Sequence, residues 1–365
     1  MSRRTIVSVL FILCCCLSLS AQNIHRWSEK KAARWYDRQP WYRGCDFIPS
    51  TAINQLEMWQ ADTFDPETID RELGWAEDLG FNIMRVFLHH VAWEQDRDGF
   101  LQRMDKYLEI SWSHGIKTMF VFMDDCWNPT ALPGKQPEPK KGVHNSGWLQ
   151  DPGDLLFRQD SDSFVEDTTA VFALLEAYVK DVLTHFKKDK RVAVWDLYNE
   201  PGGGGVHCPY REREKKFLPK VFLWASQVRP RQPITAGIWS GALNDYNQWQ
   251  IANSDIITYH TYQPFESHKE VVDTLSKYNR PMICTEYMAR TLNSTFQSIM
   301  PMLKERKVGA INWGFVSGKT NTIFPWEAPG GEDQPKLWFH DVLYPDGTPY
   351  REEEVLCIKK LTGKE

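Results

Sequence analysis

Two glutamates draw attention because each directly follows a short run of apolar, β-branched and aromatic residues. Glu200 stands in the stretch Asn199-Glu200-Pro201-Gly202, behind the run 192–198, and Glu286 ends the run 281–285. Such runs are typical of buried strands, and the Pro-Gly pair breaks the first of them. Burial raises the pKa of a carboxyl group, which suits a general acid that works near neutral pH. For Glu200 alone, a cap on the next helix is an equally good interpretation.

Taken together, the two carboxyl groups allow chemistry that neither allows alone. A protonated carboxyl group can help a leaving oxygen depart while an ionised one attacks or activates water, which is the arrangement for glycoside hydrolysis. Arg85 is expected to keep a neighbouring carboxylate ionised by charge pairing. Tyr262 is expected to hydrogen-bond the nucleophile, and His260 to orient the acid or the sugar. Asn199 is suited to binding a sugar 2-hydroxyl group.

Strand and helix patterns alternate along the chain and determine where these residues lie. The expected strands cover residues 43–48, 82–88, 117–124, 192–199, 233–239, 255–260, 282–286 and 308–315. The expected helices cover residues 66–80, 101–113, 163–186, 211–227, 242–251, 267–278, 294–304 and 351–361. The strands are nearly continuous apolar runs, as strands covered on both faces are. Eight such units predict an α/β fold, a (β/α)8 TIM barrel forming a single catalytic domain over residues 22–365.

The active site of such a barrel lies at the carboxyl ends of its strands, so those ends predict the site. Besides the two glutamates they carry the candidate substrate-binding residues Arg85, Asp124, Asn199, Trp239, His260, Tyr262 and Trp313. Trp127 joins them from the long loop after the third strand. That loop, residues 126–153, and the loop at 317–338 after the eighth strand are expected to form the walls of a cleft, because loops of this length tend to be functional.

Aromatic residues are abundant, with 16 Trp, 13 Tyr and 19 Phe in 365 residues. Five tryptophans lie beside loop signals, namely Trp127, Trp148, Trp239, Trp326 and Trp338. Exposed rings at such places offer platforms for a flat ligand with an apolar face, such as a sugar. The alternative for each ring is ordinary partial burial, since Trp is large and rarely fully covered.

Several motifs resemble those of glycoside hydrolase clan A. Within this clan they most resemble the motifs of the family 5 cellulases and mannanases. The resemblance covers residues 41–326 and rests on the Trp195-to-Pro201 run, the His260-Thr261-Tyr262 triplet, Thr285-Glu286-Tyr287, Trp313, and Arg85 within the segment 82–87. It implies that Glu200 is the acid/base, that Glu286 is the nucleophile, and that anomeric configuration is retained. Family 5 enzymes commonly have a histidine after the third strand. Here that place reads Asp124-Asp125-Cys126, and His89 and His90 after the second strand are the candidates to replace it.

No cofactor or metal is expected, because two carboxyl groups complete the chemistry. Asp124 and Asp125 are carboxylates of the kind that bind metals, but no histidine or further carboxylate is spaced to complete a site. The glycines at 202–205 form a flexible loop without the Lys-Ser/Thr of a phosphate loop. The net charge is −5 with scattered basic residues, which gives no indication of nucleic acid as a partner.

The first 21 residues are expected to be a signal peptide. Arg3 and Arg4 precede the apolar stretch 6–19, and small residues follow it at 18–21. The stretch is too short to cross a bilayer, and the small-residue context of a lipid-modified cysteine is missing. A secreted or periplasmic location without a membrane span is therefore predicted.

Five cysteines remain after cleavage, an odd number at wide spacing, which is not a disulfide framework. Cys45 and Cys284 are expected to be buried thiols. A bond between Cys126 and Cys208 is the less favoured alternative to free thiols at these positions.

These observations lead to one main hypothesis and two alternatives. The main one is a secreted retaining β-glycoside hydrolase, with Glu200 and Glu286 acting on a β-linked polysaccharide or oligosaccharide. An exo-acting β-glycosidase is the first alternative, since a long loop can block one end of a cleft. A carbohydrate-binding barrel without activity is the second, and the presence of both glutamates argues against it.

Overall fold

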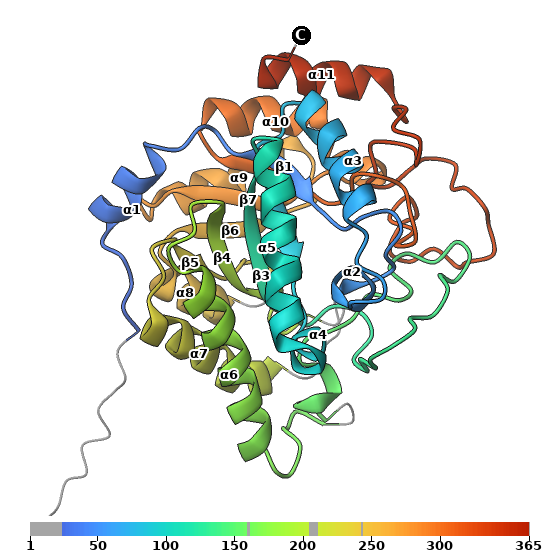
Figure 1. Cartoon of the computed structure of the whole chain (residues 1–365). Helices are drawn as coiled ribbons and strands as arrows, with labels where there is room; N and C mark the ends of the chain where they lie inside the picture. Colours follow the sequence, from blue (N-terminus) through green and yellow to red (C-terminus); the bar gives the residue numbers. More distant parts are fainter. Residues whose placement is uncertain (1–23, 159–160, 204–210, 242–243, 365) are drawn as a thin grey trace, which may run out of the picture.

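The computed structural model describes residues 24–158, 161–203, 211–241 and 244–364, and Figure 1 shows strands in its interior with helices around them. The expected signal peptide and Cys208 lie outside these residues. The strands are β1 (Arg43–Asp46), β2 (Ile83–Phe87), β3 (Lys117–Asp124), β4 (Val192–Asn199), β5 (Ile234–Thr235), β6 (Ile257–His260), β7 (Met282–Glu286) and β8 (Gly309–Asn312).

The strands form one parallel sheet that curls into a barrel. Their order is β5-β4-β3-β2-β1-β8-β7-β6. The two ends meet through Ile238, whose amide donates to Thr258 O at 3.0 Å and whose carbonyl accepts from His260 N at 2.8 Å. The predicted (β/α)8 barrel is therefore confirmed. β5 is shorter than the predicted 233–239, because beyond Thr235 the chain joins the sheet only through the bridge between Ile238 and Tyr259.

Helices cover the outside of the barrel (Figure 1). They are α1 (Glu29–Tyr36), α2 (Gln55–Trp59), α3 (Pro66–Asp78), α4 (His90–Gln95), α5 (Arg97–Ser113), α6 (Thr169–Phe186), α7 (Arg211–Val228), α8 (Asn244–Asn253), α9 (Phe265–Ser276), α10 (Phe296–Glu305) and α11 (Glu352–Thr362). The expected cap of α3 is present, since Asp65 accepts a hydrogen bond from Thr68 N at 3.0 Å. The prediction that a helix starts at residue 163 is wrong: Val165 N instead donates to Leu156 O, and Phe164 forms a bridge with Phe157.

The apolar interior has two main parts. The larger cluster fills the space between the sheet and the surrounding helices. A smaller one lies inside the barrel, where Ile83, Val194 and Ile311 from three strands meet Trp27 and Ala32 at α1. α1 was not predicted. It covers this group of inward-facing side chains and so keeps water out of the barrel interior.

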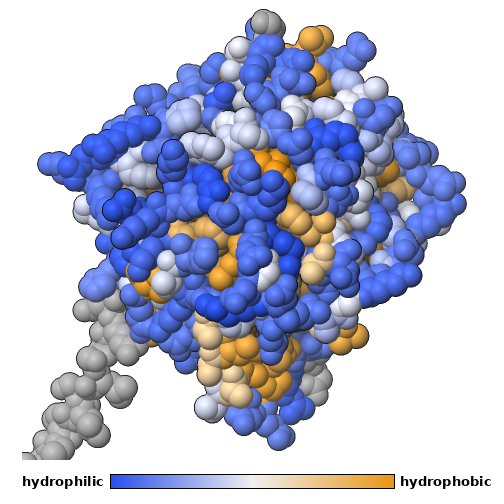
Figure 2. Space-filling view, viewed as in Figure 1, coloured by the Kyte–Doolittle hydropathy of each residue, from blue (hydrophilic) through white to orange (hydrophobic). Residues whose placement is uncertain are grey.

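The surface is largely polar on the face that Figure 2 shows, with apolar residues gathered in separate patches. Among the helices of the described residues, none combines the length and the apolar character needed to span a membrane.

The long loops after β3 and β8 lie side by side (Figure 1). Asn145 N donates to Thr320 O at 2.8 Å, and the His144 ring bonds Phe324 O at 2.7 Å. Gly331 N also donates to Lys141 O at 2.8 Å. The two loops therefore form one continuous wall, fixed by backbone hydrogen bonds, beside the ends of β1, β2 and β8.

A buried ion pair connects α11 with the chain that follows β7. Arg290 Nε donates to Glu354 Oε1 at 2.8 Å, and both side chains are buried. The same guanidinium donates to Trp338 O at 3.2 Å and to Asp341 O at 2.9 Å. Arg290 thus fixes the last helix and the end of the β8 loop against the barrel.

We expect the Glu354→Gln substitution to lower the free energy of unfolding by about 3 kcal/mol, because it leaves a buried guanidinium without its counter-charge. Urea denaturation at neutral pH measures the change. Glu353→Gln is the matched control, since the Glu353 side chain is 64% exposed, and it should change stability by less than about 0.5 kcal/mol. Equal stability of the two variants would contradict this role of Arg290.

Candidate active site

Arg85 lies at the centre of the site, fully buried in the middle of β2. Its Nη1 donates to Asp46 Oδ1 at 2.7 Å and to Glu286 Oε1 at 3.0 Å. Nε and Nη2 both donate to Asp196 Oδ2, at 3.0 and 2.9 Å, and Nη2 also donates to Asn199 Oδ1 at 2.7 Å. One guanidinium therefore joins groups from β1, β2, β4 and β7 at the carboxyl end of the barrel.

Glu286 has a donor at each of its carboxylate oxygens. Arg85 bonds Oε1, and the Tyr262 hydroxyl donates to Oε2 at 2.6 Å. Burial raises the pKa of Glu286, and the nearby Glu200 acts in the same direction. The guanidinium of Arg85 and the hydroxyl of Tyr262 oppose this rise, because both stabilise the ionised form. The expected contacts of Arg85 and Tyr262 with this carboxylate are both present.

Glu200 follows β4 and takes a backbone conformation with φ of +44°. Residues other than glycine seldom adopt this left-handed region, and such strain tends to occur at functional sites. The turn is fixed from below by Asp125, which accepts hydrogen bonds from Tyr198 Oη and Gly202 N, each at 2.7 Å. Trp239 Nε1 donates to Pro201 O at 3.3 Å. The strained position of Glu200 is thus held on both sides.

His260 lies between the two glutamates. Its Nδ1 is 2.8 Å from Glu200 Oε1 and 3.5 Å from Glu286 Oε1. Burial lowers the pKa of His260 to about 4, so the ring is neutral at pH 7. Because Nδ1 faces two carboxyl groups, we assign its single proton to that nitrogen, from which it donates to Glu200.

The two glutamates differ in the side chains that bond their carboxyl oxygens. Burial raises the pKa of Glu200 to about 7, and no cationic side chain bonds its oxygens. Glu286 instead contacts a guanidinium directly. Burial thus brings the pKa of Glu200 close to neutral pH, whereas at Glu286 the direct contact with Arg85 opposes the rise that burial causes. Oxygen atoms of the two carboxyl groups come within 4.8 Å of each other.

Asn199 and Asp124 form a buried layer under Glu200. Asn199 Nδ2 donates to Asp124 Oδ1 at 2.9 Å, and Trp148 Nε1 donates to Asp124 Oδ2 at 2.7 Å. The amide of Cys126 also donates to Asp124 Oδ1, at 2.9 Å. Both oxygens of Asp124 are thus bonded to protein groups, and Asn199 bonds Arg85 and Asp124. Direct contacts of these two residues with a sugar stay predictions.

The tryptophans named from the sequence divide into two kinds. Trp127 is 38% exposed and Trp326 is 40% exposed, whereas Trp148 and Trp338 are buried, so the expectation of a platform is wrong for the latter two. Trp127 stacks on His144 at 5.2 Å between ring centroids. Trp326 packs edge-to-face against Tyr262 at 4.9 Å, next to the contact of that tyrosine with Glu286.

Trp313 directly follows β8 and is buried against Phe87, Trp148 and Tyr262. It lines a small cavity that Asp46 also borders. Trp239 is half-buried after β5. The structure therefore brings Trp313 and Trp239 to the same end of the barrel as the glutamates, on different sides of it, while their contacts with a substrate stay predictions.

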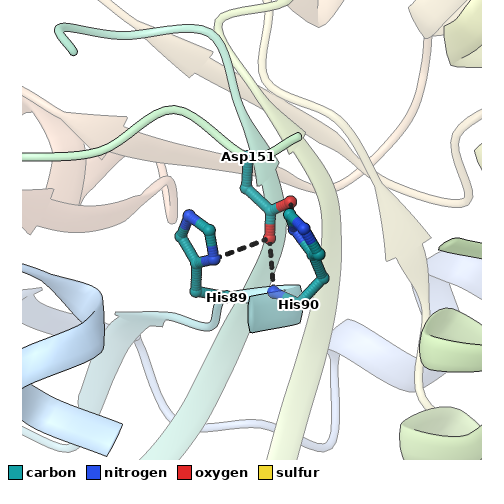
Figure 3. A group of neighbouring side chains, drawn as sticks. All are labelled: His89, His90 and Asp151. Atoms are coloured by element: carbon teal, nitrogen blue, oxygen red, sulfur yellow. Dashed lines mark hydrogen bonds and ion pairs between the residues drawn. The ribbon is translucent and has the colours of Figure 1, made fainter. Parts of the chain in front are cut away.

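His89 and His90, the candidates to replace a histidine after the third strand, are buried and turned toward Asp151 (Figure 3). His90 Nδ1 bonds Asp151 Oδ1 at 2.6 Å, and His90 N donates to Asp151 Oδ2 at 2.9 Å. The ring of His89 bonds Gln150 O through Nε2 and accepts from Val91 N through Nδ1. Both nitrogens of His89 are therefore occupied.

Asp151 in turn pairs its backbone with Asp124, each amide donating to the other's carbonyl at 2.8 Å. The cluster of His89, His90 and Asp151 thus holds the end of the long loop against β3. Within the described residues two sets of side chains have the types and proximity of metal ligands: this cluster, and the group of Glu200, His260 and Glu286. His90 bonds Asp151 in the first set and His260 bonds Glu200 in the second, while the ring nitrogens of His89 are bonded to Gln150 O and Val91 N.

Three residues of the site escaped the sequence analysis in the roles that the structure gives them. Asp46 and Asp196 are the buried counter-charges of Arg85, and Cys126 contacts Glu200. A signal existed for Asp196, because a charged residue inside an apolar run must have a buried partner. Asp46, at the end of the first strand, carries the same signal more weakly. Nothing in the sequence indicated the contact of Cys126.

The comparisons with known proteins agree with this class of fold. The family model described as the TIM barrel domain of glycosyl hydrolases family 2 matches residues 157–322, a range that includes both glutamates. A comparison with curated protein sequences gives no match. The family model and the paired carboxyl groups support a glycosidase on a TIM barrel.

Solved structures with the same fold include several glycoside hydrolases. A variant of GH5_18 from Streptomyces cattleya in complex with Manb1-4GlcNAc is 12% identical, with a TM-score of 0.59 over 88% of this chain and 80% of that one. A family 5 mannosidase from Rhizomucor miehei is 14% identical, with a TM-score of 0.55 over 88% and 92%. An endo-beta-1,4-mannanase from Thermotoga petrophila is 13% identical, with a TM-score of 0.53 over 90% and 77%. At these identities the likeness shows a shared fold.

We expect Arg85→Met to lower the free energy of unfolding at pH 7 by at least about 3 kcal/mol, because it leaves Asp46, Asp196 and Glu286 buried without a counter-charge. The loss should be smaller at pH 5. Without the guanidinium these carboxyl groups have pKa values further above those in the unfolded chain, so the folded variant binds more protons and loses stability as pH rises.

Urea denaturation at both pH values tests this expectation. Arg351→Met is the control, since that side chain is 42% exposed, and its effect should be small and independent of pH. If the loss of unfolding free energy in Arg85→Met were larger at pH 5 than at pH 7, this result would contradict the assignment of Arg85 as the counter-charge.

Proposed function

We propose that this protein is a secreted retaining β-glycoside hydrolase that cleaves a β-linked polysaccharide or oligosaccharide by double displacement. The observation that carries the proposal is the pair of carboxyl groups, less than 4.8 Å apart at their nearest oxygens, with one near pKa 7 and the other bound to a guanidinium. Retaining enzymes separate these groups by about 5–5.5 Å and inverting enzymes by about 6.5–9.5 Å. Secretion rests on the expected signal peptide.

In the first step, Glu286 attacks the anomeric carbon with a carboxylate oxygen. The bond from that carbon to the leaving oxygen breaks, and Glu200 gives its proton to this oxygen. In the second step, Glu200, now ionised, takes a proton from a water molecule. The oxygen of that water attacks the anomeric carbon, the bond to Glu286 breaks, and both carboxyl groups return to their starting states.

The surrounding side chains prepare the pair for both steps. Arg85 and Tyr262 orient the nucleophile and keep it ionised, while His260 orients the acid through Glu200 Oε1. In this proposal the exposed rings of Trp127 and Trp326 stack on sugar units at the edge of the cleft. Asp124, Asn199, Trp239 and Trp313 would contact or position the sugar nearest the reacting carbon.

The substrate class is best tested with a panel of β-linked mannans, glucans, xylans and galactans and their oligosaccharides. Mannosides come first, because the structures with the same fold include a mannosidase, a mannanase and a complex with Manb1-4GlcNAc. Monosaccharide release from chain ends would identify an exo-acting enzyme, and mixed oligosaccharides an endo-acting one. Binding without any cleavage across the panel would favour a carbohydrate-binding barrel and overturn the proposal.

Glu286→Ala should lower kcat by about 10⁴-fold or more, since no nucleophile remains. Added azide should restore turnover and give a glycosyl azide of inverted configuration, which NMR of the product identifies. Glu266→Ala on the exposed surface of α9 is the control and should keep full activity. Full activity of Glu286→Ala would overturn the assignment.

For Glu200→Ala the loss of kcat should be smaller on substrates with good leaving groups, because the departure of such groups needs no proton.

The pH dependence of kcat/KM should be bell-shaped, with its basic limb near pH 7 where Glu200 loses its proton.

Tyr262→Phe removes a hydrogen bond that favours the ionised form of Glu286 and so raises the pKa of that group. The acid limb of the variant should therefore move to higher pH, and kcat/KM should fall about tenfold or more. A fall in kcat/KM with an unmoved acid limb would show that Tyr262 acts in some other way.

A further inference from the structure

The thiol of Cys126 lies against the carboxyl group proposed as the general acid. Its Sγ is 3.3 Å from Glu200 Oε2, and Asn199 Nδ2 donates to the same sulfur at 3.6 Å. We infer that Cys126 is a positioning residue for Glu200, which holds one carboxyl oxygen in place and tunes how readily the group gives up its proton. The inference rests on the proposed function, since it concerns the role of Glu200 in that reaction.

The contact involves the carboxyl oxygen that His260 does not bond. His260 Nδ1 donates to Glu200 Oε1, whereas Oε2 lies beside Sγ. The two oxygens of Glu200 thus have different partners, an imidazole on one and a thiol on the other. The backbone of Glu200 is in a strained conformation, and these two side-chain contacts fix where its carboxyl group points.

Cys126 is itself held firmly in place. Its amide donates to Asp124 Oδ1 at 2.9 Å, and Asp124 also binds Asn199 and Trp148. Burial raises the pKa of the Cys126 thiol well above its usual value, and the nearby carboxyl groups add to this effect. The group is therefore a neutral thiol that can donate, and its hydrogen bond lowers the pKa of Glu200 against the larger effect of burial.

The other charged or titratable groups around Glu200 come from four strands and the residues that follow them. They are Arg85 from β2, Asp124 from β3, His260 and Tyr262 from β6 and the residues after it, and Glu286 from β7, with Asn199 of β4 as the polar neighbour. The substitutions that test Cys126 leave all of these unchanged. A thiol is a weaker donor than a hydroxyl, so serine and alanine at this position should change the pKa of Glu200 in opposite directions.

The experiment compares the pH dependence of kcat/KM for wild type, Cys126→Ala and Cys126→Ser on the polysaccharide that the wild type cleaves best. Alanine removes the donor, raises the pKa of Glu200 and should move the basic limb up by about half a pH unit or more. Serine strengthens the donor and should move the same limb down. Unmoved limbs in both variants, or shifts in the same direction, would overturn the inference.

A second measurement does not depend on activity. In a background with Cys208 and Cys357 replaced by serine, the rate of alkylation of Cys126 by iodoacetamide is followed against pH. Glu200→Gln removes a carboxylate that disfavours the thiolate, so alkylation should become about tenfold faster at a given pH. Glu266→Gln is the matched control and should leave the rate unchanged. An unchanged rate in Glu200→Gln would overturn the contact.

The two measurements separate failure of the inference from failure of the proposed function. If the wild type cleaves no β-linked saccharide, the proposed function fails while the alkylation rates still report on the thiol and the carboxyl group. If the wild type is active and neither the limbs nor the alkylation rates change, only the positioning role of Cys126 fails.

Discussion

The buried guanidinium of Arg85 is the constraint on which the rest of the site depends. A charge without access to water is tolerated only when it is paired and hydrogen-bonded. Arg85 meets this requirement with Asp46 from β1, Asp196 and Asn199 from β4, and Glu286 from β7. The contacts fix strand ends that lie on different sides of the barrel. The position of Glu286 therefore follows from the satisfaction of a buried charge.

The same arrangement makes two chemically identical side chains different. Glu286 shares the guanidinium, whereas Glu200 has only neutral partners, His260 and Cys126, on its two oxygens. Burial outweighs the opposing effects of the Cys126 hydrogen bond and of the Arg85 charge, and it raises the pKa of Glu200 to about 7. Because His260 is itself neutral, it orients Glu200 without drawing the proton away. The difference between the two carboxyl groups, on which the proposed roles of acid and nucleophile rest, follows from which oxygen atoms each neighbour contacts.

Around this centre, the loops after β3 and β8 decide what has access to the pair. They form one wall because backbone amides of one bond carbonyls of the other, as in the contact of Asn145 with Thr320. The cluster of His89, His90 and Asp151 holds the end of the first loop against β3. Trp127 and Trp326 stay exposed on these loops, while Trp148 is buried with its indole on Asp124. Loop residues thus supply both the support of the site and its exposed aromatic surface.

Much of the architecture was predictable because it depends on patterns of residues that are close together in the sequence. Apolar runs that end in Glu200 and Glu286, the Asp65 cap, and eight alternating units predicted the barrel and the end of it that carries the site. Errors arose where a contact distant in sequence replaced the local preference. The segment before α6 is extended because Phe164 pairs with Phe157, and β5 is short because only Ile238 reaches β6.

By itself, the sequence determined which side chains are available for chemistry and which strand ends carry them. Only the tertiary structure decided which atoms meet: that Arg85 shares one nitrogen between Asp46 and Glu286, and that Cys126 contacts Glu200. The physical reason is that strand patterns depend on neighbouring residues in the chain. Hydrogen bonds of buried charges depend on the closure of the barrel, which brings together groups that are far apart in sequence.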